Sequence, residues 1–199
     1  MSPAVLLVAF SMTTPEFSLP ASGWEKLARA LQSFSRAPSE ENCKAVDKLL
    51  PASMHLMYDD SPEAQRALEQ LEAALPTLEH LVTSKSRLGV GLAFRLFVTM
   101  SDGHLAEELD IILGKLIRLD PVMFLEELQS VRPAYPVEGL DGLVGNLGDE
   151  FVDDFKGQCE QLHLRLKAIE SVDRRDLAQV RGRCERALIE SLKGTCDAA

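Results

Sequence analysis

The segment from Leu88 to Leu128 constrains the fold most strongly, because it is predicted to form three consecutive helices around one core. Between Leu88 and Met100, nearly every side of the first of these helices is apolar, and Arg95 is the only charged residue. A helix that is apolar all round is a buried helix. The sequence therefore predicts an all-α protein in which a central helix, over about residues 86–100, is wrapped by other helices.

The composition supports this class. Aromatic residues make up only 6% of the 199 residues, so the core must consist mainly of Leu, Ala and Val, which favours helices over a β-sandwich. A chain of this length suits one domain, which we place at residues 22–199 after an N-terminal segment at 1–21. No apolar run reaches the ~18 residues that a membrane span requires, so no transmembrane span is expected.

Short breaks with helix start signals separate the predicted helices. Ser39 and Ser61 are followed by acids or proline, which are favoured in a first helical turn. Pro76 is expected to interrupt the third helix, so that its continuation leaves at an angle. Two long helices, over about 149–170 and 173–193, close the chain. We predict an irregular layered bundle of about eight helices, with α-solenoid-like packing, that ends in a long helical hairpin.

The N-terminus carries features of an export signal. An apolar run from Pro3 to Phe10 ends in Ala9-Phe10-Ser11, with small residues at the spacing of a signal-peptidase site. No Lys or Arg precedes the run, which is short; a start codon assigned too far downstream would explain both departures. The alternative is a segment that docks on the core. The sequence favours an exported, periplasmic protein over a cytoplasmic one.

The cysteines predict a disulfide rather than a metal site. Cys43, Cys159, Cys184 and Cys196 include no Cys-x-x-Cys pair, so zinc is not expected, and their even number fits an exported protein. Cys159 and Cys184 are almost equally distant from the turn expected near residues 171–172. In a pair of antiparallel helices, these two cysteines would lie side by side, at the same position along the helix axes. We therefore predict a Cys159–Cys184 disulfide, with two buried thiols as the alternative.

The motifs of common cofactor sites are missing, so no cofactor and no metal are predicted. Glu160 and His163 supply one Glu-x-x-His copy, whereas a di-iron bundle needs two copies and two further glutamates. Gly89-Val90-Gly91 lacks the preceding strand and the third glycine of a dinucleotide fingerprint. These two glycines are expected to allow close helix packing instead.

The charge of the chain argues against nucleic acid as a partner. The formal net charge is −10, and binding to phosphates requires a positive face. The arginines between residues 174 and 186 are interleaved with Asp176 and Glu185, which is typical of a solvated helix face.

Arg95 is the residue singled out for function. A lone charge in an apolar helix must be paired or must reach water, so one interpretation of Arg95 is a structural ion pair or a side chain that extends to the surface, and the other is a polar group at the base of a binding groove. We expect partners on the next helix, and take Arg95, Glu107 and Glu108 as candidate binding residues. Other acids that could pair with Arg95 are Asp110, Glu126 and Glu127. The sequence favours a non-catalytic binding or scaffolding domain that uses a groove between helices to bind another protein. The alternative is a small-ligand-binding protein or an enzyme in which Arg95 recognises a carboxylate.

Overall fold

The computed structural model describes residues 20–50, 60–99, 103–131, 140–148, 151 and 153–196. Within these ranges the chain is helical and contains no strand, which confirms the predicted all-α class. The α-helices are α1 (Ala21–Arg36), α2 (Glu40–Asp47), α3 (Pro62–Thr83), α4 (Arg87–Thr99), α5 (His104–Leu119), α6 (Pro121–Val131), α7 (Leu140–Gly145), α8 (Phe155–Glu170) and α9 (Ala178–Cys196), and a 3₁₀ turn, η5 (Arg175–Leu177), precedes α9.

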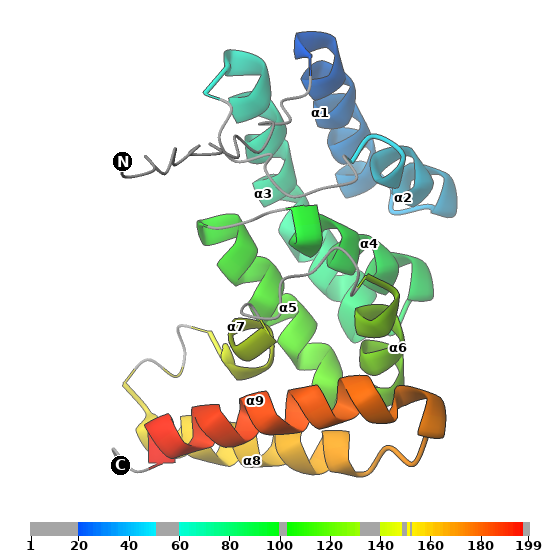
Figure 1. The fold of residues 1–199 in the computed structure, drawn as a ribbon. Coiled ribbons are helices and arrows are strands. Elements are labelled where there is room, and N and C mark those ends of the chain that lie inside the picture. The colour runs from blue at the N-terminus through cyan, green and yellow to red at the C-terminus, as the bar shows by residue number, and fades with distance from the viewer. Residues whose placement is uncertain are drawn as a thin grey trace, which may run out of the picture.

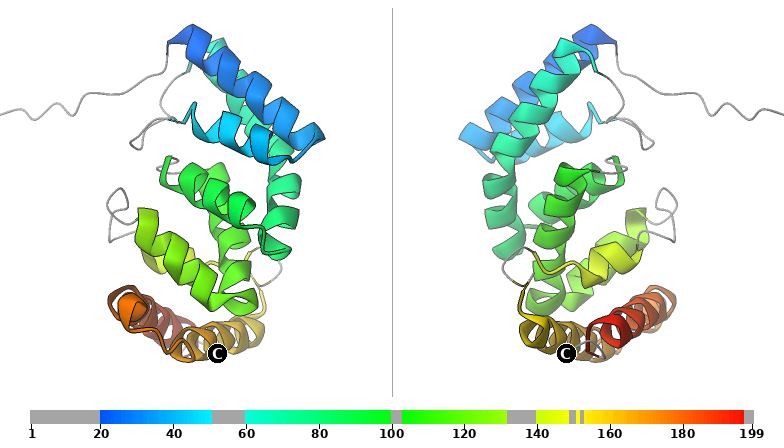
Figure 2. Two further views of the ribbon diagram at one scale, coloured as in Figure 1. Left: turned by 90° about the vertical axis from the view of Figure 1, so that its right-hand side faces the viewer. Right: turned by 90° about the vertical axis from the view of Figure 1, so that its left-hand side faces the viewer.

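The helices are stacked in layers, as predicted (Figures 1 and 2). α1 and α2 form one end of the molecule together with the first part of α3, and α8 and α9 form the other end. α4, α5, α6 and α7 lie between these ends, and α3 reaches from the first layer into the middle one, where it contacts α4 and α5. The last layer is the predicted helical hairpin.

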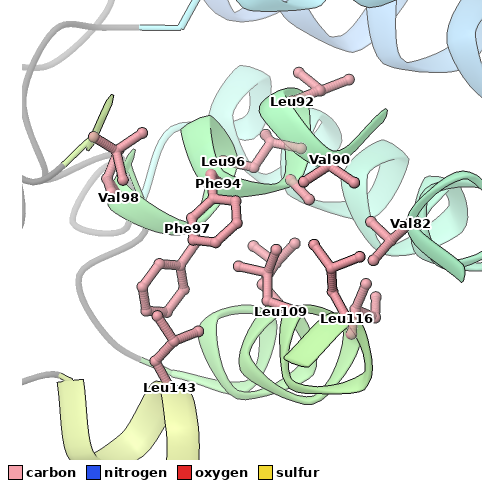
Figure 3. Close-up of a cluster of buried hydrophobic side chains, with 14 of the residues drawn as sticks. Val82, Val90, Leu92, Phe94, Leu96, Phe97, Val98, Leu109, Leu116 and Leu143 are labelled. Atoms are coloured by element: carbon pink, nitrogen blue, oxygen red, sulfur yellow. The ribbon is translucent and has the colours of Figure 1, made fainter. Parts of the chain in front are cut away.

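α4 is the central buried helix that the sequence predicts. Phe94 is fully buried, and its ring lies 5.6 Å from that of Phe124 on α6. Figure 3 shows the α4 side chains gathered with those of α5 and α7 in one apolar cluster. Gly89 allows α4 to approach α3, because a Cβ there would lie only 2.4 Å from the Cβ of Leu81. Leu88 is the apolar side chain of this helix that stays exposed, with 41% of its surface accessible, and it lies beside the exposed Arg87 in the first turn.

The predicted interruption at Pro76 is wrong, since α3 continues from Pro62 to Thr83 with the proline inside it. Pro76 and Glu72 are both exposed, so water can reach the Glu72 carbonyl that loses its helical donor. Residues on both sides of the proline are buried along one stripe, and this burial keeps the two parts in one helix. The helix is bent rather than broken: its two parts run in different directions in Figure 2, so the predicted change of direction within this segment is present.

The predicted Cys159–Cys184 disulfide is also wrong. Cys159 is bonded to Cys196, with the two Cα atoms 5.5 Å apart, and Cys184 is a free, buried thiol. The link between α8 and α9 runs from Ser171 through η5, so α9 begins only at Ala178. The link runs on past the end of α8 before the chain turns back (Figure 1), so α9 begins beyond the end of α8 and Cys196, rather than Cys184, lies opposite Cys159. Cys184 instead faces the core.

The export signal predicted for residues 1–21 falls almost entirely outside the described residues, so it stays a prediction. None of the described helices combines the length and apolar character needed to cross a membrane.

Candidate functional site

A groove of about 590 Å³ lies where α2, α4 and α6 meet, and Arg95 is part of its wall. We call it the Arg95 groove. The residues that characterise it are Cys43 and Asp47 of α2, Leu88, Leu92 and Arg95 of α4, and Glu127 of α6. In Figure 1 these three helices follow one another down one side of the molecule. The predicted combination of an interhelical groove with Arg95 is therefore present in the fold.

Helical spacing on α4 builds one wall of this groove. Leu88, Leu92 and Arg95 are separated by four and three residues and therefore share one face of the helix. Gly91 lies on the same face, where an added Cβ would meet only a Glu127 carboxylate oxygen at 3.7 Å. Gly91 therefore leaves the groove open, and the close packing predicted for both glycines is found at Gly89 alone.

Helix α2 forms the opposite wall of the groove, and hydrogen bonds at its N-cap fix where this helix begins. The Ser39 hydroxyl accepts a hydrogen bond from the Asn42 backbone N–H at 3.2 Å, and the Asn42 side chain donates to the carbonyl of Ala37 at 2.8 Å. These bonds fix the start of the helix, while Cys43 and Val46 are buried beneath it. The last residue of the helix, Asp47, is thereby placed beside α4.

Arg95 pairs with an acid that the sequence analysis did not consider. Its Nε donates to Asp47 Oδ1 at 3.0 Å, and the Arg95 side chain remains 32% exposed. Neither Glu107 nor Glu108 lines the groove, and Glu108 lies 3.9 Å from His104 instead. The structure therefore joins Arg95 to α2 across 48 residues of sequence rather than to the following helix.

Because this ion pair is exposed, the Arg95→Met variant should lower the free energy of unfolding by less than about 1 kcal/mol, the usual limit for surface pairs. The Asp47→Asn variant should behave alike. Urea denaturation of both variants against the wild type checks this. A loss of about 3 kcal/mol or more in either variant would indicate a buried ionic network instead.

Three further ionic contacts surround the groove. Arg87 binds Glu126 at 2.8 Å and approaches Glu127 to 4.0 Å, and Lys44 binds Glu40. Burial raises the pKa of Glu127, and nearby Arg87 opposes that shift. Hydrogen bonds from Arg87 and then Arg174 lower the pKa of Glu126. The groove thus combines apolar walls with charged side chains of both signs.

A second unusual site was missed by the sequence analysis. Arg165 is only 4% exposed, and its Nη1 donates to the carbonyls of Val144 and Asn146 at 2.6 and 2.9 Å. Gly114 makes room for it, since a Cβ there would lie 2.5 Å from Arg165 Nη2. The signal was available: Arg165 lies three residues after Leu162 and four before Ile169, on the buried face of α8.

Asp110 lies near this arginine and is itself largely buried. Its Oδ1 is out of contact with water and has no hydrogen-bond partner among the described residues. Burial, and then Glu107, raise the pKa of Asp110 to about 7, and the charge of Arg165 opposes the shift. Burial and Arg118 lower the pKa of Arg165 to about 10, which leaves it charged at neutral pH.

A hollow of about 470 Å³ beside Arg165 is lined by two more cations, Lys115 and Arg118. Lys115 binds Glu79 at 2.6 Å, and Arg118 donates to Gln161. Since each of the three cations already has a partner within the protein, we assign this region a structural role that ties α3 to α5 and α5 to α8.

Among the described residues, one group of side chains is arranged to hold a metal ion: Cys159, His163 and Cys196, whose ligand atoms lie within 4.8 Å of one another. The two sulfurs are bonded to each other in this structure.

No protein-family model, curated protein or solved structure shows a significant match to this chain.

Proposed function

We propose that this protein is a non-catalytic binding domain whose Arg95 groove receives an amphipathic helix of a partner protein. The observation that carries the proposal is the position of Leu88. It is a leucine that is 41% exposed, in the first turn of a helix whose other large apolar side chains are buried, at the edge of a groove with further apolar side chains in its walls. An apolar side chain of a partner could cover Leu88 and exclude water from it.

The dimensions of the groove suit a helix face. Helix recognition depends on a few apolar anchors, spaced three or four residues apart, that enter an apolar groove. Leu88 provides the exposed contact for an anchor, and the nearly buried side chains of Leu92, Val98 and Val131 line the rest of the apolar wall. A volume of about 590 Å³ provides room for two or three such anchors.

The charges around the groove favour a partner helix that carries a carboxylate. Three cations, Lys44, Arg87 and Arg95, line the groove against two acids, Asp47 and Glu127, although the chain as a whole has a net charge of −10. Each of these cations is in an exposed ion pair, and an exposed pair adds little to stability. An incoming carboxylate can therefore replace Asp47 as the partner of Arg95 at little cost.

A selection from a displayed library of helical peptides tests this function. Peptides enriched on the wild type should carry apolar residues at positions i and i+4 and an acidic residue beside them. Leu88→Glu should weaken their binding by about tenfold or more, since it places a charge against an apolar anchor. Leu164→Glu is the matched control, because Leu164 is equally exposed, at 43%, but lies on α8. It should leave the affinity unchanged.

A charge exchange tests the role of Arg95 in the same assay. Arg95→Glu should weaken binding of the acidic peptides, and a peptide with its acid replaced by lysine should recover affinity for that variant. The proposal fails if no peptide is enriched, or if the enriched peptides bind Leu88→Glu as well as the wild type.

A fluorescent long-chain carboxylic acid is tested in parallel. If that compound alone binds in a Leu88-dependent manner, the small-ligand alternative replaces the helix.

A further inference from the structure

The open end of the α8–α9 hairpin brings together three side chains that bind transition metals. Cys159 and His163 are four residues apart on α8 and therefore share one helix face, and Cys196 is the last residue of α9. A sulfur or ring nitrogen of each lies within 4.8 Å of the others. His163 thus stands beside the Cys159–Cys196 disulfide, although the bridge itself needs no histidine.

We propose that reduction of the Cys159–Cys196 disulfide converts this end of the hairpin into a zinc-binding site. Two thiolates and one imidazole are a ligand set that Zn²⁺ prefers, and three protein ligands leave its fourth tetrahedral position open to water or to a further ligand. The set differs from the Cys-x-x-Cys pattern, because two ligands come from one helix turn and the third from the neighbouring helix.

The conversion is a two-electron reduction followed by exchange of protons for metal. A dithiol reductant transfers two electrons and two protons to the disulfide, which breaks the S–S bond and yields two thiols, and the reductant becomes a disulfide itself. Zn²⁺ then displaces one proton from each thiol and binds the neutral imidazole. Reoxidation by a disulfide compound reverses these steps and releases the metal.

The disulfide and the zinc-bound form of the two cysteines exclude each other for geometric reasons. Sulfurs that are each about 2.3 Å from a tetrahedral zinc ion lie about 3.8 Å apart, which is far longer than an S–S bond. The required movement of the sulfurs is small. The Cα atoms of the two cysteines are 5.5 Å apart, and each sulfur can change its position by rotation about the Cα–Cβ bond. The redox state of the surroundings therefore selects between a cross-link and a metal site.

The surroundings of the three ligands favour a cation. Cys196 ends α9, where the unpaired carbonyls carry partial negative charge. His163 is exposed and the two cysteines are half-buried, so a metal ion can enter without unfolding of the hairpin. The other two cysteines do not compete, because Cys43 and Cys184 are both buried in the core. Burial raises the pKa of Cys184 to about 12, which disfavours its thiolate.

Titration of the full chain with Co²⁺ as a spectroscopic substitute for Zn²⁺ tests the proposal. After reduction with a phosphine and its removal under nitrogen, the wild type should bind one equivalent with the visible bands of tetrahedral Co²⁺ and a thiolate charge-transfer band. The oxidised wild type should bind none. Zn²⁺ should displace the Co²⁺, and competition with a chromophoric chelator then gives the zinc affinity.

The histidine distinguishes a three-ligand site from a simple pair of thiols. His163→Ala leaves both cysteines in place and should weaken zinc binding roughly tenfold or more, since even loss of a residue that only supports a ligand has that effect. His104→Ala, which removes another exposed histidine, is the matched control and should bind like the wild type. Circular dichroism checks that each reduced variant stays helical. Equal affinities of reduced wild type and His163→Ala, or equal binding before and after reduction, would overturn the proposal.

Discussion

Phe94→Ala and Leu113→Ala should each lower the free energy of unfolding by about 2–5 kcal/mol, because each truncation leaves a cavity that close-packed helices cannot fill. Both side chains are fully buried, Phe94 on α4 and Leu113 on α5. Phe94 also loses its ring contact with Phe124, which adds to the cost of the lost apolar burial. The effect should be among the largest for any single truncation, since α4 contacts α2, α3, α5 and α6.

Chemical denaturation monitored by circular dichroism measures these losses. Leu119→Ala is the control, because Leu119 is 44% exposed near the end of α5 and its truncation should change stability by no more than about 0.5 kcal/mol. If Phe94→Ala or Leu113→Ala unfolded as late in the titration as this control, the centre of the core would lie elsewhere.

The features that the sequence predicts correctly are those with local causes. Ser39 and Ser61 begin α2 and α3 because a hydroxyl and the next backbone N–H groups lie within three residues of each other. The burial of α4 follows from its own apolar residues. The order of helices and the terminal hairpin follow from such local patterns together with short connections.

The features that the sequence analysis misses depend on which helices meet in space. Arg95 pairs with Asp47 only because the layers bring α2 over α4, and no pattern within either helix specifies this. The partner of Cys159 depends on the residues used by the link before α9, which decides between Cys184 and Cys196. Arg165 is the exception, since its place on the apolar face of α8 was visible in the sequence.

The contribution of Asp110 to the stability of the protein should fall as the pH rises from about 4 to 7, through the titration of its carboxyl group. Its native pKa is about 7, against 3.8 for the ordinary group, so the folded protein holds this proton more tightly than the unfolded chain does. At pH values between these two pKa values, Asp110 is protonated to a greater extent in the native state than in the unfolded state. The stabilisation is therefore complete below about pH 4 and is lost as the pH passes 7.

Asp110→Asn removes this titration and retains the shape of the side chain. At pH 8 the variant should be more stable than the wild type by about 2–4 kcal/mol, which corresponds to the shift in pKa less an allowance for partial exposure. At pH 4 the two proteins should have nearly equal stability. Urea denaturation at both pH values, with the exposed acid Glu69→Gln as the control, gives the comparison. The difference between variant and wild type cancels the titration of all other groups.

The opposite outcome is informative, because two forces act on this carboxyl group. Burial favours its neutral form, and the charge of Arg165 favours the carboxylate. Burial is the larger of the two forces. In agreement with this, Asp110 Oδ1 is buried without a hydrogen-bond donor among the described residues, and Arg165 Nη1 donates instead to two backbone carbonyls. If Asp110→Asn were less stable than the wild type at pH 8, the attraction to Arg165 would be the stronger force. The pair would then be a buried salt bridge between α5 and α8, and Arg165→Met should cancel the effect of the Asp110 substitution.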